Sequence, residues 1–510
     1  MKRNNIIKIL LVSFITLVLL SIFSYTYAFF SLQIEGTGKD IVMSTGDLRL
    51  EYKDETKLKF ENAVPGDTIS KVITVKNIGT KNVSYSLYWG NLINTIDNYE
   101  LHVTLDCKSY TNYGEETQTE SGTCENIYRA VPISDTVTTG NIKGKISIDP
   151  NITHEYTVTL KFDNKNYNQN NNKNKTFRGQ IGIKEYIAPE PIYCTFDGEM
   201  VQGAEYVNGQ YTYRYMQEGA YPESGLAWTN IVEDGWGVQL TDKTSTEPVT
   251  SKLCTYINNK PVTNMRYMFY DSKATSIDLS SFDTSNVTDM SHMFYGSSAT
   301  TLDLSSFDTS NVTDMSYMFH ESAVTIIDLS SFNTSNVTTM YGMFYGSSGT
   351  TLDLSNFNTS NVTDMSWMFG YNKIITLDLS SFNTNNVTNM RYMFKGSKAT
   401  TLDLSSFDTS NITDMSHMFY GSSATTLDLS SFDTINVTDM SGMFYQCPNL
   451  KTIYTSNIFN TNSVTSSSNM FYNTTNLVGG AGTTYNSSYV DKTYAIIDGG
   501  TSSPGYFTAK

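Results

Sequence analysis

The 510-residue chain has few of the residues on which catalytic and metal sites are usually built. It holds five His and five Cys, and no two Cys are spaced as C-x-x-C, which disfavours a structural zinc site. It contains neither a G-x-S-x-G nor an H-E-x-x-H segment, the motifs of many serine hydrolases and zinc peptidases. We therefore expect a protein that is not an enzyme, with an extracellular hydrolase as the weakest of the functions considered.

Basic residues are also scarce. Lys and Arg number 34 against 50 Asp and Glu, so the formal net charge is −16. Proteins that bind nucleic acid need clustered Lys and Arg to contact phosphates. Nucleic acid is therefore not an expected partner, and the simplest explanation of the negative charge is solubility.

The N-terminal residues 1–30 read as an export segment. Lys2, Arg3 and Lys8 precede a stretch without charge from Ile9 to Phe30. Such a segment is either a signal peptide, cut after Ala28, or an uncleaved membrane anchor. Both alternatives place the rest of the chain outside the membrane, at the cell surface or secreted. Contact with the membrane is expected only through residues 9–30, if these are retained.

Export permits disulfide bonds. Cys107 and Cys124 flank a polar excursion, and Cys194 and Cys254 bracket the segment before the repeats. We expect each pair to form a disulfide, which leaves Cys447 over. Metal binding by these Cys is the rival reading, but no neighbouring His supports it.

Residues 31–188 show the alternation of β-strands, for example in Tyr156-Thr-Val-Thr-Leu-Lys-Phe162, and turn residues separate these segments. They predict an all-β, immunoglobulin-like sandwich. The apolar segment ending Tyr27-Ala-Phe-Phe30, with Gly46-Asp-Leu-Arg-Leu50 and Pro65-Gly-Asp67, resembles exported camelysin and biofilm-fibre domains of Gram-positive bacteria. Prolines at 189–192 predict a linker. Residues 193–263 are expected to cap the repeats that follow, and the alternative for this segment, which is rich in Tyr and Gly, is a separate aromatic ligand site.

A 25-residue unit dominates residues 264–477. The Met of each M-x-x-M-F segment recurs at Met265, Met290, Met315, Met340, Met365, Met390, Met415 and Met440. A period of this length predicts stacked units that bury their apolar faces against their neighbours. Thr301-Leu-Asp-Leu304 reads as a short parallel strand, and the stretch from Asn311 to Phe319 reads as a short helix. The expected fold class is therefore an α/β leucine-rich-repeat-like solenoid, with one strand and one helix in each turn and a C-terminal cap at residues 478–510.

The repeat Leu-Asp-Leu-Ser-Ser-Phe-Asp-Thr-Ser-Asn-Val-Thr-Asp-Met-Ser-x-Met-Phe resembles that of BspA-type leucine-rich repeat surface proteins of bacteria. The tail from Asn476 to Phe507 is similar to the ending of that family. The resemblance covers roughly residues 193–510. It implies a surface-exposed, adhesin-like role and names no ligand.

Three columns of polar or aromatic residues recur with the repeat. One is an acidic ladder on the strands: Asp278, Asp303, Asp328, Asp353, Asp378, Asp403 and Asp428. It is either a solvated face or a strip that attracts cations, calcium among them, or a basic partner. A second column begins each N-x-T segment, from Asn286 to Asn436. We expect its Asn residues to cap helices or to make stacked backbone hydrogen bonds.

The third column varies between turns. It consists of the residues around M-F, and its ligand-contact candidates are Tyr295, Tyr317, Tyr345, Trp367, Tyr392 and Tyr420. Invariant repeat positions maintain the stack, whereas variable aromatic positions are free to face a ligand or simply to fill the surface. His292, His320 and His417 occupy equivalent variable positions, so we expect no metal or catalytic role for them.

These features predict an exported cell-surface protein whose solenoid binds an extracellular protein or glycan, without a cofactor. The alternative is a structural component of a biofilm or extracellular matrix, in which the N-terminal sandwich polymerises by strand addition.

Overall fold

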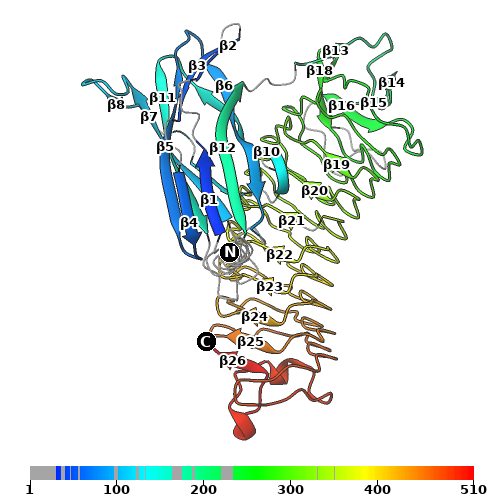
Figure 1. Cartoon of the computed structure of the whole chain (residues 1–510). Helices are drawn as coiled ribbons and strands as arrows, with labels where there is room; N and C mark the ends of the chain where they lie inside the picture. The colour runs from blue at the N-terminus through cyan, green and yellow to red at the C-terminus, as the bar shows by residue number, and fades with distance from the viewer. Residues whose placement is uncertain are drawn as a thin grey trace, which may run out of the picture. The chain divides into compact units, whose positions relative to one another are not determined.

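The computed structural model divides into two compact units, Met1–Ile187 and Ala188–Lys510, each with a hydrophobic core of its own (Figure 1). It describes residues 30–35, 41–45, 48–54, 58–96, 101–121, 124, 126–131, 134–162, 175–185, 190–219, 234–329, 331–349 and 351–510. The expected export segment before Phe30 lies outside these residues. Over the described ranges, no helix has the length and apolar character needed to cross a bilayer.

The first unit consists of two β-sheets. The first sheet has the order β10-β6-β12-β1-β4; among its described strands, β1 and β12 pair in parallel and the other pairs are antiparallel. The second has the order β2-β3-β5-β11-β7-β8, and β9 also pairs with β7. The strands are β1 (Phe30–Glu35), β2 (Ile41–Thr45), β3 (Leu48–Lys53), β4 (Leu58–Ala63), β5 (Thr68–Asn77), β6 (Val83–Asn94), β7 (Leu101–Thr111), β8 (Thr119–Glu120), β9 (Ile127–Ala130), β10 (Ser134–Ile148), β11 (Ile152–Phe162) and β12 (Thr176–Glu185).

One core lies between these two sheets. Trp89 of β6 and Phe177 of β12 come from the first sheet, Val103 of β7 and Tyr156 of β11 come from the second, and all four are buried. The Tyr52 hydroxyl on β3 donates to the carbonyl oxygen of Ile181 on β12 at 2.8 Å, which joins the sheets directly. Alternating inward residues thus build a two-layer β-structure.

The second unit opens with a six-stranded sheet of order β13-β17-β18-β16-β15-β14. Its strands are β13 (Tyr193–Cys194), β14 (Glu205–Asn208), β15 (Tyr211–Met216), β16 (Gly235–Leu240), β17 (Tyr256–Ile257) and β18 (Lys260–Asn264). Tyr211 and Trp236 belong to the same continuous core as the repeats, and the ring of Tyr211 meets that of Phe282 edge-on at 6.1 Å. The sheet therefore covers the apolar end of the first turns, as a capping segment must.

The structure contains both expected disulfides. Cys107 and Cys124 are joined at the polar excursion of the first unit, with their Cα atoms 5.5 Å apart. Cys194 and Cys254 are joined in the capping sheet, with Cα atoms 5.8 Å apart. Cys447 is a buried free thiol inside the repeat coil.

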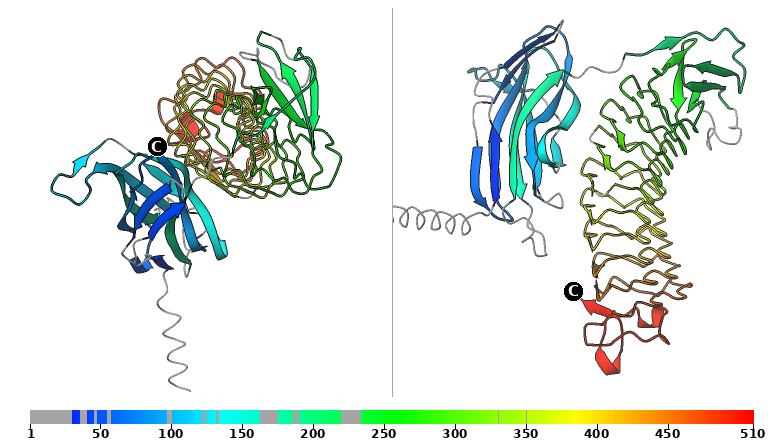
Figure 2. Two further views of the ribbon diagram at one scale, coloured as in Figure 1. Left: turned by 90° about the horizontal axis from the view of Figure 1, so that it is seen from above. Right: turned by 45° about the vertical axis from the view of Figure 1, so that its right-hand side comes forward.

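The repeats wind into a coil of nearly identical turns, seen end-on and from the side in Figure 2. The turns from Thr301 onward each contribute one very short strand, and these strands pair in parallel within three small sheets, β19-β20-β21, β22-β23 and β24-β25-β26. These strands are β19 (Thr301–Leu302), β20 (Ile326–Ile327), β21 (Thr351–Leu352), β22 (Thr376–Leu377), β23 (Thr401–Leu402), β24 (Thr426–Asp428) and β25 (Thr452–Thr455). The unit ends with the 3-10 turns η2 (Lys492–Tyr494) and η3 (Gly500–Ser502) and with β26 (Phe507–Ala509), which pairs with β25.

The expected fold class is wrong in its second half, because the described repeats contain no helix. The M-x-x-M-F segment makes a succession of reverse turns instead. The amide of Met293 donates to the carbonyl of Met290, and His292 between them has a φ of +59°, a pattern typical of type II turns. A left-handed residue in every turn stops helix propagation, so the spacing of the apolar residues reflects inward-facing corners of a coil.

Hydrogen bonds between successive turns take the place of helical hydrogen bonds. The backbone amides of His292, Phe294 and Gly296 donate to backbone carbonyls 24 residues further along, at 2.8–2.9 Å. The acceptors are the carbonyls of Ser316, Met318 and His320, respectively. A buried Thr in each turn adds a clamp. Thr359 Oγ1 donates to the carbonyl of Asn383 and accepts from its amide, both at 2.8 Å. The same pattern recurs along the array, in whole or in part, at Thr284, Thr309, Thr334, Thr384, Thr409 and Thr434.

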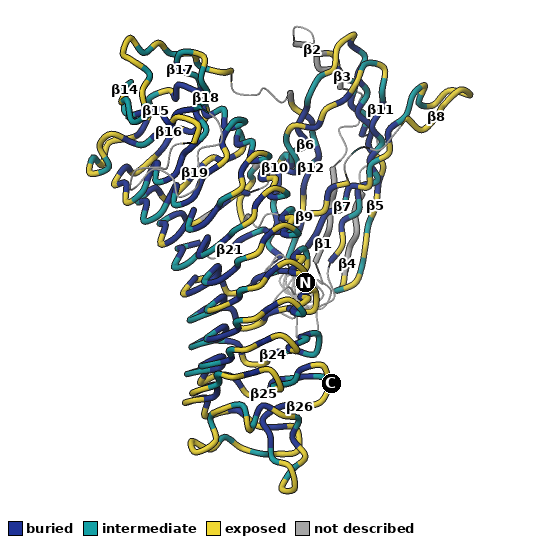
Figure 3. The backbone as a smooth tube through the Cα atoms, turned by 180° about the vertical axis from the view of Figure 1, so that it is seen from behind, coloured by how far each residue is buried: buried dark blue, intermediate teal, exposed yellow. Residues whose placement is uncertain are grey.

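The interior of the coil is filled by apolar side chains, and the residues that carry them are among the buried ones coloured dark blue on the backbone in Figure 3. The ring of Phe319 lies 5.6 Å from that of Phe294 and 5.8 Å from that of Phe344, nearly parallel to both. Met315 and Met318 are fully buried beside it. Burying each such side chain stabilises the fold by roughly 1.5–3 kcal/mol. This stabilisation exists only because a neighbouring turn covers the side chain.

We predict that Thr359→Val lowers the free energy of unfolding by about 1–3 kcal/mol, because valine keeps the shape of the buried Thr359 but removes the hydroxyl that pairs with both the amide and the carbonyl of Asn383. The matched control is Thr363→Val. The exposed Thr363 hydroxyl donates to Thr338, and water can replace it, so a loss within about 0.5 kcal/mol is expected. Calorimetric unfolding of the full chain measures both. Equal losses in the two variants would contradict the clamp.

Candidate functional site

Two columns of aromatic side chains run along the coil beside the M-x-x-M-F segments. Column A occupies the left-handed position of each turn and consists of Tyr267, His292, Tyr317, Trp367, Tyr392 and His417, with Gly342 and Gly442 as interruptions. Column B follows the Phe of each segment and consists of Tyr270, Tyr295, His320, Tyr345, Tyr420 and Tyr445, with Gly370 and Lys395 between its two halves.

Neighbouring rings of each column are in contact, tilted at this end of column A and stacked in column B. In column A the centroid of His292 lies 4.5 Å from that of Tyr267 and 4.6 Å from that of Tyr317. In column B the centroid of Tyr295 lies 4.8 Å from that of Tyr270 and 4.2 Å from that of His320. The columns are themselves in contact, because Tyr267 and Tyr270 meet edge-on at 5.3 Å. Aromatic pairs of this kind are worth about 0.5–1.5 kcal/mol beyond their burial.

Column A carries its rings at a conformational cost. Tyr317 has a φ of +57° and Trp367 a φ of +61°, and a bulky residue in this region is strained by about 1–3 kcal/mol. Gly342 and Gly442 adopt the same φ at the same repeat position, so the backbone is compatible with glycine there. The aromatic residues are thus present for their side chains and not for the turn.

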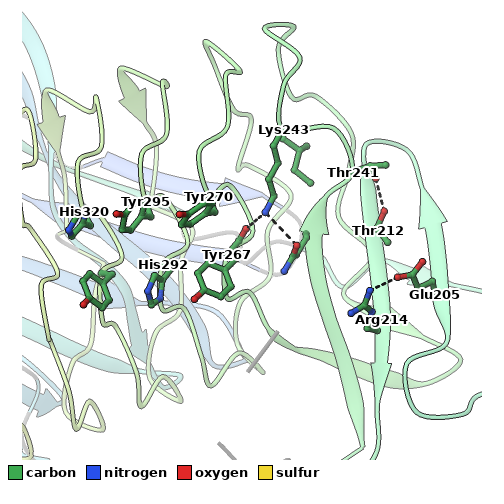
Figure 4. A pocket seen from close by; sticks show the side chains of 13 residues that line it. Glu205, Thr212, Arg214, Thr241, Lys243, Tyr267, Tyr270, His292, Tyr295 and His320 are labelled. Atoms are coloured by element: carbon green, nitrogen blue, oxygen red, sulfur yellow. Dashed lines mark hydrogen bonds and ion pairs between the residues drawn. The ribbon is translucent and has the colours of Figure 1, made fainter. Parts of the chain in front are cut away.

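A groove of about 980 Å³ opens where the columns meet the capping sheet (Figure 4). One wall consists of the first rings of both columns, and the other consists of polar residues from β14, β15, β16 and the segment after β16. The lining residues are Glu205, Thr212, Arg214, Gln239, Leu240, Thr241, Lys243, Tyr267, Tyr270, His292, Tyr295, Tyr317 and His320. A volume of this size is within the range of protein ligand sites.

Lys243 reaches into this groove. Its Nζ donates to the carbonyl of Tyr267 at 2.7 Å and to Oε1 of Gln239 at 3.4 Å. It also lies 5.8 Å from the centroid of Tyr270. Burial lowers the pKa of Lys243 to about 8, although the nearby negative charge of Asp271 acts to raise it. The ammonium is therefore held where a further acceptor would stabilise its charged form.

The cap side of the groove is polar but internally paired. Arg214 Nη2 lies 2.5 Å from Glu205 Oε1, and both side chains are partly exposed. Thr212 and Thr241 share a hydrogen bond of 2.9 Å between their hydroxyls. This wall offers hydrogen-bond donors and acceptors with little net charge.

A second cluster surrounds Lys395 further along the coil. Its Nζ lies 4.7–5.4 Å from the centroids of Trp367, Tyr371, Tyr392 and Tyr420. Contacts of an ammonium with ring faces at such distances are favourable. Here the cation is Lys395 of the same chain, so its ammonium already occupies the space between these rings.

The structure thus separates the six aromatic candidates. Tyr295 and Tyr317 line the groove, whereas Tyr345 stacks on His320 at 4.3 Å just beyond it. The other three, Trp367, Tyr392 and Tyr420, surround Lys395. Sequence reasoning missed Tyr267 as a groove residue, although it occupies the same repeat position as His292 and Tyr317. It also missed Lys243, Arg214 and Glu205, which no repeat or motif marks.

The acidic ladder forms turns. Oδ1 of Asp303 accepts the amide of Ser305 at 3.0 Å, and Oδ1 of Asp403 accepts that of Ser405 at 3.1 Å. Asp278, Asp353, Asp378 and Asp428 make the same contact with the residue two positions on. Asp328 is exposed. These contacts are Asx-turns, which account for the column without a bound cation.

The Asn column makes the stacked hydrogen bonds, and with no helix in the described repeats it has none to cap. Nδ2 of Asn311 donates to the carbonyl of Ser285 in the preceding turn at 2.7 Å, and Asn336 and Asn361 repeat the contact. Over the described part of the chain, the one group with metal-ligand spacing is Cys107, Cys124 and His154. Because these two Cys form a disulfide, their sulfurs are not metal-binding thiolates.

Fold and site together define a repeat protein of the β-solenoid kind, with a capped coil and an aromatic groove at its capped end. The chain belongs to the family described as Mycoplasma protein of unknown function, DUF285, whose model matches residues 244–348, 321–408 and 396–503. This match is compatible with a repeat surface protein, and the finer leucine-rich repeat resemblance stays a prediction. No curated protein and no solved structure matches the chain.

We predict that Asp403→Asn leaves the unfolding free energy within about 0.5 kcal/mol of the parent, because an amide oxygen also accepts the turn amide. Asn333 and Asn358 already do so at another repeat position, where Asp308 and Asp408 stand in other turns. Asp403→Ala removes the acceptor and should cost about 0.5–1.5 kcal/mol. Thermal unfolding with and without calcium measures both variants. If calcium raised the melting temperature of the parent and Asp403→Asn abolished this rise, the hypothesis that the acidic ladder binds calcium would be supported instead.

A second prediction concerns acid stability. Burial lowers the pKa of His320 to about 4 and that of His292 to about 3, and their Nδ1 atoms are buried without a hydrogen-bond partner. Unfolded His takes up a proton below about pH 6.5, whereas the folded chain does so only near pH 3–4. Protonation therefore favours unfolding, and stability should fall as the pH drops from 6.5 to 4.

The test is His320→Tyr, which matches the neighbouring Tyr295 and Tyr345. The melting temperature of the variant should depend less on pH between 6.5 and 4 than that of the parent. The buried Asp289, whose pKa is raised to about 6 by burial and by Asp314, has the opposite effect in both proteins and cancels in the comparison. Identical pH profiles would refute the prediction.

Proposed function

We propose that this chain is an exported cell-surface binding protein, without catalytic activity, whose repeat unit attaches to an extracellular macromolecule. The observation that carries the proposal is the groove between the capping sheet and the first rungs of columns A and B. Binding surfaces are enriched in Tyr and Trp, because these side chains give large contact area at low entropic cost. Here the rings are further fixed by stacking, which lowers the cost of ordering them on binding.

Two further observations support this proposal. The aromatic residues of column A are kept in a strained conformation that glycine would relieve, and strain of this kind is concentrated at functional sites. The polar residues that complete the groove come from non-repetitive sequence before the array. The surface at the capped end of the array therefore differs in composition and shape from the surface along its middle. A groove built from both parts has a defined shape, whereas a uniform repeat face would bind anywhere along its length.

The expected partner is an extracellular protein or glycan, and export places the repeats where they can meet it. The structural alternative assigns the main role to the first unit, as a matrix-forming domain. The two roles differ in where a substitution in the second unit should have an effect.

The test is binding of the full-length chain to an array of extracellular-matrix proteins and glycans. A double variant Tyr270→Ala and Tyr295→Ala should reduce a saturable signal at least tenfold. The matched control is Tyr420→Ala with Tyr445→Ala, which removes two rungs of the same column outside the groove and should leave binding within about twofold, a difference of less than ~0.5 kcal/mol. Absence of any saturable ligand, or equal losses in both double variants, would refute the groove and favour the structural role.

A further inference from the structure

The two aromatic columns form a lattice with a fixed repeat at the groove. Two successive steps of column B, 4.8 Å from Tyr270 to Tyr295 and 4.2 Å from Tyr295 to His320, together span about 9 Å. Two steps of column A, through Tyr267, His292 and Tyr317, also span about 9 Å. The columns lie side by side, with ring centroids of the same turn 5.3–6.0 Å apart. A long ligand in register with this lattice must repeat at the ring spacing or at a multiple of it.

Among peptide conformations, polyproline II matches every second ring of each column. It makes one turn in three residues with a rise of about 3.1 Å per residue, so side chains on one edge recur about every 9.3 Å. A β-strand places side chains of one face roughly 6.6 Å apart, and it falls out of register with the lattice after one step. A polyproline II helix has three edges. Two of them can lie along the two columns while the third faces solvent.

The hydrogen-bonding groups of the groove fit the same ligand. A polyproline II backbone has no internal hydrogen bonds, so its carbonyl oxygens need external donors. Lys243 has three N–H donors, two of which are used on Tyr267 and Gln239. The phenol groups of Tyr270 and Tyr295 add donors along column B.

The charges of the groove favour a neutral segment. Glu205 and Arg214 neutralise each other on the cap wall, and the charge of Asp271 offsets that of the Lys243 ammonium, so an uncharged carbonyl is a sufficient further acceptor. Proline supplies such carbonyls, has no backbone N–H that would need a partner, and pays little entropy to adopt the helix. Aromatic-lined grooves recognise proline-rich segments in this way.

We propose that the groove binds a proline-rich segment of another protein in the polyproline II conformation, with its proline rings on columns A and B. This inference rests on the proposed binding function and specifies its ligand.

The experiment titrates the full-length chain with a fluorescently labelled nonaproline peptide and follows fluorescence anisotropy. A glycine-serine peptide of equal length is the negative ligand. We expect saturable binding of nonaproline and at least tenfold weaker binding of the glycine-serine peptide. Tyr295→Ala should weaken nonaproline binding at least tenfold, since it removes the central rung of column B in the groove.

Tyr445→Ala is the matched control variant. Tyr445 also lies between two stacked rings, Tyr420 of column B at 4.7 Å and Tyr472 at 5.1 Å, so the two substitutions disturb the coil alike. Its affinity for nonaproline should stay within twofold of the parent, and both variants should keep the circular dichroism of the parent. Lys243→Met, which keeps the length of the side chain but not the ammonium, should also weaken binding several-fold.

Three outcomes would overturn the inference: no binding of nonaproline, equal affinity for both peptides, or equal losses in Tyr295→Ala and Tyr445→Ala. A glycan or a proline-free protein that binds on the array through Tyr270 and Tyr295 would also overturn it while sustaining the proposed function. If neither nonaproline nor any array ligand binds through the groove, both proposals fail.

Discussion

The hydrogen bonds between residues 24 positions apart are the interaction on which the second unit depends. They satisfy the backbone of segments that form no helix and hardly any strand, and they fix the distance between turns. Because a buried backbone group without a partner is costly, this ladder allows irregular-looking turns to form a stable core. The buried Thr clamps, such as Thr359 on Asn383, strengthen the ladder at the position where the chain turns inward.

The fixed distance between turns has a second consequence, outside the core. Every side chain that projects at the same point of the repeat meets its counterparts at ring-stacking distance. Phe294 and Phe319 use that distance to fill the interior, and Tyr270 and Tyr295 use it to build a column on the surface. The same spacing that stabilises the fold therefore gives the groove its regular period. Polar side chains also recur at the same point of each turn. The Asp residues hydrogen-bond within their own turn and the Asn residues hydrogen-bond to the preceding turn, so both columns stabilise the coil.

What distinguishes the groove from the rest of the coil is the capping sheet. Midway along the array, the aromatic positions surround Lys395 and are occupied by the chain's own cation. At the capped end, Arg214, Glu205 and Lys243 come from sequence without repeats and form a wall opposite the rings. The capping sheet covers the first turns of the array for stability, and it also gives this end a shape that the rest of the array does not have. Specific binding requires a surface of unique shape.

The sequence by itself determined the period, the inward positions such as Met315 and Phe319 and the aromatic columns, because these follow from spacing and residue type. It suggested the two disulfides, but only the structure decided the pairing. It failed on the helix, since the apolar spacing of a coil corner matches that of a helical face and the left-handed φ of Tyr317 leaves no mark in the residue type. It also could not separate Tyr295, which lines the groove, from Tyr420, which lies against Lys395. Only the tertiary structure decided that, because residues from β14 to β16 lie near one end of the array and close a groove there.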